Sequence, residues 1–151
     1  MAMNQLFLLL LVAAASIVAS SATNTTSNST APSPTAYEML GKYGFPPGIL
    51  PQGVRHYVLH PDGSFNVSLP GDCEIKVAGY TLRYRSIIHG NIKSLLISEL
   101  DGLSFKLVIQ SVGGNLGVSE VKREGDDLRF QAGVVSKSFP FSDFAVSRRC
   151  N

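Results

Sequence analysis

The sequence has little charge, few cysteines and no helical periodicity after its first third. Its 13 Lys and Arg residues and 11 Asp and Glu residues leave a formal net charge of +2 in 151 residues. Because the basic residues are scattered, this small excess gives no electrostatic basis for nucleic-acid binding. A chain of this length predicts one domain with a sizeable core.

Common catalytic and cofactor motifs are also missing from the sequence. It contains no Gly-x-Ser-x-Gly turn, no Walker loop and no His-Glu-x-x-His zinc motif. His56 and His60 have the spacing of zinc ligands on a helix, but their segment alternates like a strand. On a strand they would lie about 13 Å apart, too far to share one metal ion. We therefore expect no metal site and no cofactor.

No catalytic residue can be assigned from the sequence. Ser119, His89 and Asp143 could be combined into a triad, but nothing local distinguishes that serine from other serines of a β-protein. Four carboxylates have no partner that the sequence can show. We expect them at solvated strand ends: Glu99, Asp101, Glu120 and Glu124.

An apolar run near the start of the chain is typical of a secretory signal. Residues 6–18 carry no charge and are followed by small residues, which predicts a cleaved signal peptide over residues 1–22. The run is shorter than the roughly 20 residues of a spanning helix, so we expect no transmembrane span after cleavage. An uncleaved signal anchor is the alternative. The expected destination is the extracellular space, reached through the endoplasmic reticulum.

The next segment, residues 23–35, contains only Thr, Asn, Ser, Ala and Pro. Without apolar surface it cannot offset the loss of chain entropy, so we predict a disordered linker. Asn24 and Asn28 begin two acceptor triplets for N-glycosylation within it. A third triplet begins at Asn66, inside a predicted strand, where it is acceptable only on the solvent face.

A short helix and a proline-rich connector follow the linker. Thr35 and Glu38 have the spacing of a capping box, and Gly44 stands where a helix C-cap glycine belongs. Residues 44–51, Gly-Phe-Pro-Pro-Gly-Ile-Leu-Pro, must be extended because proline fixes φ and disfavours helix in the preceding residue. We expect the apolar side chains of this connector to be buried across the edge or open end of a sheet.

Beyond Pro51, apolar and polar residues alternate with a period of two. Turn signals of two to five residues separate the runs and no helix intervenes, which favours an antiparallel meander. Residues 36–151 are therefore predicted to form one mainly β domain of about eight antiparallel strands, with one short N-terminal α-helix. A small barrel is slightly favoured over a coiled sandwich because closure hides edge strands. The predicted runs are 54–60, 65–69, 73–78, 80–85, 95–100, 103–109, 118–124 and 128–134.

The last residues of the chain contain too many aromatic side chains for a solvent-exposed tail. Phe139, Phe141 and Phe144 should dock on the sheet, at its open end if it is a barrel. Cys73 and Cys150 are the only cysteines, so they form the single possible intramolecular disulfide on an oxidising secretory route. Two free thiols are the alternative.

Several motifs occur in the order found in one known family. They are residues 37–40 (Tyr-Glu-Met-Leu), 42–51, 62–65 (Asp-Gly-Ser-Phe), 69–73 (Leu-Pro-Gly-Asp-Cys) and 138–144, followed by Cys150. From Ala36 to Cys150 the chain resembles the plant family catalogued as domain of unknown function 538. The resemblance implies a plant origin, a mostly β fold with an N-terminal helix and, frequently, a secretory signal.

That family has no established reaction. A relation to lipid-binding bactericidal/permeability-increasing proteins and a role with chlorophyll have both been suggested for it, and neither supplies a catalytic motif. Residues 145–149, Ala-Val-Ser-Arg-Arg, depart from the family, whose members are often acidic and contain proline there.

Two classes of function remain. The first is a non-catalytic binding module whose barrel mouth accepts an apolar or lipid-like ligand or a membrane surface. The same rim residues could instead simply fill the barrel. The second is a hydrolase acting on a lipid, pigment ester or cell-wall glycan through His89 or a carboxylate, which has no motif behind it. The sequence does not indicate an oligomeric state. The predicted rim residues are Phe45, Ile49, Leu50, Phe139, Phe141 and Phe144.

Overall fold

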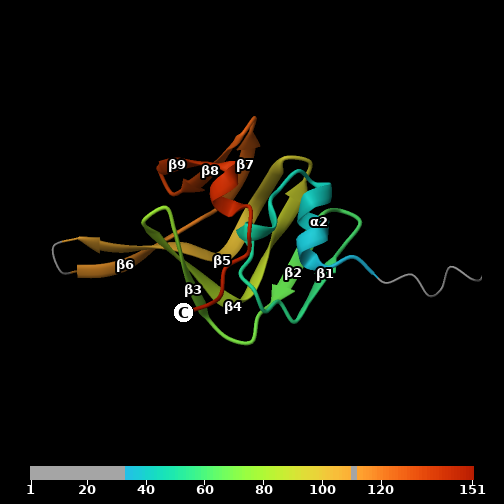
Figure 1. Ribbon diagram of the computed structural model, residues 1–151, viewed down its shortest axis with the longest axis horizontal. Helices are drawn as coiled ribbons and strands as arrows, with labels where there is room; N and C mark the ends of the chain where they lie inside the picture. Colours follow the sequence, from blue (N-terminus) through green and yellow to red (C-terminus); the bar gives the residue numbers. More distant parts are fainter. Residues whose placement is uncertain (1–32, 110–111) are drawn as a thin grey trace, which may run out of the picture. The chain divides into compact units, whose positions relative to one another are not determined.

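The computed structural model describes residues 33–109 and 112–151 (Figure 1). The predicted signal peptide, most of the predicted linker, and the triplets at Asn24 and Asn28 therefore lie outside the described residues. Contacts divide the chain into the units Met1–Ser33 and Pro34–Asn151, and every described helix and strand belongs to the second unit. None of its described helices is long and apolar enough to cross a membrane.

The described strands form an antiparallel sheet, and a long hairpin lies at its centre. β4 (Tyr80–Lys93) and β5 (Leu96–Ile109) each run for 14 residues. The sheet follows the order β1-β2-β4-β5-β7-β8-β9, with β3 added beside β4 and β6 beside β5. The remaining elements are α2 (Ala36–Lys42), the 3₁₀ helices η2 (Pro47–Ile49) and η3 (Phe141–Phe144), and the strands β1 (His56–Leu59), β2 (Ser64–Ser68), β3 (Cys73–Val77), β6 (Val112–Gly117), β7 (Glu120–Glu124), β8 (Asp127–Ala132) and β9 (Val135–Pro140).

The predicted mainly β fold with one short α-helix is confirmed. The sheet of the described residues is not closed, so it corresponds only approximately to a barrel or a coiled sandwich. Three predicted breaks between strands are wrong. His89 to Asn91 lies within β4 and Asp101 with Gly102 lies within β5. Register shifts mark β-bulges between β4 and β5 at this point, and a bulge bends a strand without ending its pairing. The segment left between the predicted runs 103–109 and 118–124 contains strand β6.

Helix α2 begins at the predicted capping box. Thr35 Oγ1 accepts a hydrogen bond from the Glu38 amide at 3.1 Å, and the Glu38 carboxylate accepts one from the Thr35 amide at 3.5 Å. Met39 and Leu40 are buried in the core. A helix of two turns is not stable alone, so the burial of this face holds α2 on the sheet.

The connector, residues 44–51, packs against the C-terminal tail, residues 141–151, and we call these two segments the clasp. Ser147 Oγ donates a hydrogen bond to the Pro47 carbonyl at 2.8 Å. Gly48 lies directly against the backbone of the tail. In Figure 1 the tail, coloured red, descends beside the connector toward the start of β3.

The predicted disulfide between Cys73 and Cys150 is confirmed, and it fastens the tail to β3. It joins residues 77 positions apart, and closing such a loop stabilises the fold by roughly 4 kcal/mol on a chain-entropy estimate. Next to it, the Asn151 amide donates a hydrogen bond to the Glu74 carbonyl at 3.0 Å. The Gln52 amide donates to the carbonyl of Arg148 at 2.8 Å, so the tail is bound on both sides.

Tyr84 connects the clasp to the core of the sheet. Its side chain is buried, and its hydroxyl donates a hydrogen bond to the Ile49 carbonyl at 2.6 Å. Burial raises the pKa of Tyr84, because the phenolate would lose its hydration in this apolar environment. The hydrogen bond satisfies a carbonyl of η2 that would otherwise be buried without a partner.

Gly48→Ala should destabilise the domain by about 1–3 kcal/mol, the usual cost of overpacking. The added Cβ would overlap the carbonyl oxygen of Phe144 and lie 2.7 Å from its carbonyl carbon, so the tail would have to move. Gly71→Ala is the matched control, since a Cβ there meets no atom within 4 Å. Urea unfolding of both variants measures the difference, and equal stability would show that the clasp is not closely packed at Gly48.

The stability of the domain should fall as the pH rises above about 10, the ordinary pKa of tyrosine. In that range the unfolded chain loses the Tyr84 proton while the folded chain keeps it, so rising pH favours unfolding. The expected contribution to the slope is about 1.4 kcal/mol per pH unit. Tyr84→Phe should reduce the slope and cost about 1–3 kcal/mol at neutral pH through the unpaired Ile49 carbonyl. Urea unfolding from pH 8 to 11 tests this, and an identical slope in both proteins would contradict it.

Candidate functional site

The six residues predicted to rim a ligand mouth gather around the clasp, and five of them are buried. Each of the five is at most 5% exposed. Phe141 is half-buried, with the Arg123 guanidinium carbon 4.4 Å from its ring centroid. A ligand could touch the other five only if the clasp opened, so their role in binding stays a prediction. These five are Phe45, Ile49, Leu50, Phe139 and Phe144.

The space beneath α2 and the connector is a small apolar cavity. Its volume is about 30 Å³, whereas pockets for small ligands usually measure about 300–1,000 Å³. Met39 and Leu50 line it from one side, and Phe65 and Ile97 line it from the sheet. The cavity is too small for an acyl chain, so the side chains fill this end of the sheet.

At the opposite end of the β4–β5 hairpin, the inner face of the sheet is accessible. A mostly apolar groove of about 130 Å³ lies there, between strands β4 to β6 and strands β8 and β9. The side chains that line it include Tyr80, Leu107, Leu116, Val135 and Lys137.

The groove exists because other side chains cover only one end of β9. Phe139 pairs with Leu128 and is 3% exposed, whereas Val135 pairs with Ala132 and is 54% exposed. These β9 residues face inward together, since alternate residues of a strand share a face. Around Phe139, aromatic ring centroids lie 5.4–6.2 Å away, and they belong to Tyr80, Phe105, Phe130 and Phe144.

We call this region the open end and define it as residues 76–81, 106–107, 113–117 and 131–137. Large apolar side chains are exposed there: Val134 completely, Val135 by 54%, Tyr80 by 39% and Leu107 by 36%. These ranges contain three lysines and no Asp or Glu. The lysines are Lys76, Lys106 and Lys137.

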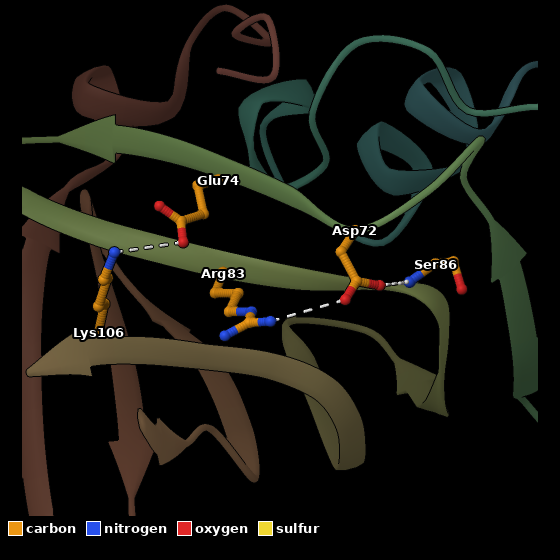
Figure 2. Close-up of polar contacts among 5 residues, drawn as sticks. All are labelled: Asp72, Glu74, Arg83, Ser86 and Lys106. Atoms are coloured by element: carbon orange, nitrogen blue, oxygen red, sulfur yellow. Dashed lines mark hydrogen bonds and ion pairs between the residues drawn. The ribbon is translucent and has the colours of Figure 1, made fainter. Parts of the chain in front are cut away.

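The outer face of strands β3 to β6 carries a polar groove of about 360 Å³. Figure 2 shows Arg83 extending toward Asp72, and Lys106 toward Glu74, on this face. The N···O distances are 3.7 Å for the first ion pair and 3.5 Å for the second. The Ser86 amide also donates a hydrogen bond to the Asp72 carboxylate at 3.0 Å.

The three residues considered as a catalytic triad, Ser119, His89 and Asp143, have no contacts with one another. His89 Nε2 lies 3.0 Å from Asp101 Oδ2, and both side chains are more than half exposed. Ser119 Oγ donates instead to the Gln131 carbonyl at 3.3 Å, and the Asp143 carbonyl accepts a hydrogen bond from Arg148. The described residues contain no group of three or more His, Cys, Asp or Glu side chains suited to a metal ion.

Asn66 is exposed on β2, opposite Val58 on one side and His89 on the other. This is the solvent face that a glycosylated strand residue requires. Its modification stays a prediction, as does that of the two triplets outside the described residues.

Comparison with protein families matches residues 36–145 to the family described as "Protein of unknown function, DUF538". This chain belongs to the DUF538 family. The DUF538 match extends from the start of α2 to the residue after η3 and ends before Cys150. Comparisons with curated proteins and with solved structures find no match. The family match therefore establishes which domain this DUF538 protein contains, but it assigns no ligand and no reaction.

One local signal in the sequence points to the open end of this DUF538 protein. Val134 and Val135 directly follow Gly133, so they fall at a turn, where polar residues are expected. The alternation predicts a single strand over residues 128–134, and that prediction misses the start of β9 at Val135. The pairing that places Lys137 beside Tyr80 is long-range, and nothing in the sequence indicates it.

Proposed function

We propose that this DUF538 protein is a secreted, non-catalytic binding module whose open end docks on an anionic lipid surface. The observation that supports this most directly is the combination of exposed apolar side chains and three lysines at the open end, whose residue ranges contain no Asp or Glu. Val134 and Val135 would enter the boundary between headgroups and acyl chains, where interfacial segments bury their apolar face by about 5–10 Å. Lysines around them would meet the lipid phosphates.

Charge supports an anionic rather than a neutral surface. A basic residue close to an anionic membrane contributes about 1 kcal/mol of attraction. Lys137 Nζ lies 5.5 Å from the Tyr80 ring centroid and so stands at the groove itself. Lys106 is already paired with Glu74, so Lys76 and Lys137 would supply most of the attraction.

Cavity volumes favour docking on a surface over enclosing a ligand. The internal cavity of about 30 Å³ and the open groove of about 130 Å³ are both smaller than ordinary ligand pockets, which begin near about 300 Å³. The groove could receive the end of one chain but not a whole lipid. The proposal is therefore attachment to a surface, not transport of a lipid.

Secretion is supported by two independent features. The apolar run at residues 6–18 has the length and flanking residues of a secretory signal. The disulfide between Cys73 and Cys150 is the kind of bond that persists in oxidising compartments.

Vesicle co-sedimentation tests the proposal. The protein should bind phosphatidylserine-containing vesicles, bind pure phosphatidylcholine vesicles much more weakly, and lose affinity as salt is added. Lys137→Gln should weaken binding about fivefold, the equivalent of the 1 kcal/mol expected for one lysine. Val134→Asp should weaken it by about tenfold or more, because it removes an inserted side chain and adds a negative charge.

Val146→Asp is the matched control, since Val146 is 72% exposed but lies in the tail, outside the open end. It should bind like the unmodified protein. Equal losses in Val134→Asp and Val146→Asp, or equal binding to neutral and anionic vesicles, would contradict the proposal.

A further inference from the structure

The polar groove on the outer face of β3 to β6 is not used by the proposed function. Its volume of about 360 Å³ falls in the range of ordinary small-ligand pockets. Gly102, Ser104 and Gly117 contribute little side-chain bulk to its lining. The longer side chains of Arg83 and Arg85 line the same hollow.

Hydrogen-bond donors exceed free acceptors in this groove. Asp72 accepts from the Ser86 amide and is paired with Arg83, while Asp101 is paired with His89 at 3.0 Å. Both carboxylates are therefore already engaged. None of the ion pairs among the described residues involves the Arg85 guanidinium, and its side chain is exposed.

Arg83 and Arg85 also have a spacing that suits one anion. They are two positions apart on β4, on the face opposite the buried residues Leu82 and Tyr84, so their Cα atoms are about 7 Å apart. Guanidinium groups bind phosphate oxygens through paired, charge-assisted hydrogen bonds. The Arg83–Asp72 contact of 3.7 Å is long for a hydrogen bond and leaves most Arg83 donors available.

We infer that this groove binds a phosphate ester of a polyol. Arg83 and Arg85 take the phosphate oxygens, and the side chains of Ser104 and Asn115 form hydrogen bonds with hydroxyl groups. This site does not depend on the proposed lipid docking, because it lies on the other face of the sheet from the apolar groove.

Calorimetric titration of the protein, expressed through a secretory host, tests the site with inositol 1,4,5-trisphosphate as the probe. Arg85→Gln should weaken binding by about tenfold or more, as expected for the loss of a charge-assisted pair. Asn115→Asp should weaken it similarly by placing a carboxylate in the groove. The matched control Arg55→Gln removes an exposed arginine that does not line the groove, and it should bind like the unmodified protein.

The phosphorylated polyol could be a soluble sugar phosphate or the headgroup of a phosphoinositide. Two experiments distinguish these two sources. Tight binding of the free probe that Arg85→Gln weakens by about tenfold or more supports a soluble ligand. Binding only to vesicles containing phosphatidylinositol 4,5-bisphosphate, weakened to the same extent by Arg85→Gln, supports a lipid headgroup. Absence of both, or equal losses in Arg85→Gln and Arg55→Gln, overturns the site.

Failure of this site is distinguishable from failure of the lipid docking. Val134→Asp should leave titration with the free probe unchanged, while Arg85→Gln should leave Val134-dependent binding to phosphatidylserine vesicles largely intact. Loss of free-probe binding in Val134→Asp would contradict the assignment of the ligand to the polar groove.

Discussion

The close approach of Gly48 to the backbone at Phe144 is the constraint on which the rest of this structure depends. Only a residue without a Cβ lets the connector and the tail approach so closely. That approach sets η2 where the Ile49 carbonyl accepts the hydrogen bond of the buried Tyr84 hydroxyl. It also leads the tail to β3, where Cys150 closes the disulfide with Cys73. One contact between distant segments thus seals the end of the sheet that α2 covers.

One end of the sheet is covered by the clasp and α2, and the other end is accessible to solvent. The β4–β5 hairpin extends from the clasp to the open end, so the buried core and the exposed apolar groove occupy opposite ends of the same strands. Phe139 marks the boundary on β9, because it is buried among aromatic rings while Val135 is exposed. A surface that contacts the open end would therefore not disturb the contacts on which the fold depends.

Local signals in the sequence predicted most of the fold. The capping box at Thr35 and the alternation beyond Pro51 each depend on residues close in the chain, and the two cysteines allow only one pairing. The prediction that the connector is extended throughout is wrong, because Pro47–Ile49 forms the 3₁₀ helix η2. The bulges in β4 and β5 were missed because Gly90 and Gly102 resemble turn glycines, although tertiary pairing keeps the strands continuous. The sequence does not predict the candidate sites either, because they depend on tertiary pairing. Which side chains lie around Lys137 or Arg85 depends on register and coiling, which periodicity does not contain.

The open end, and not the clasp, should contact a lipid surface. Amide hydrogen exchange with and without phosphatidylserine vesicles tests this most directly, because it reports each end of the sheet separately. Docking through the open end predicts slower exchange in residues 131–137 and unchanged exchange in residues 44–51. Slower exchange in residues 44–51 with no change in residues 131–137 would contradict it and would return the binding site to the clasp.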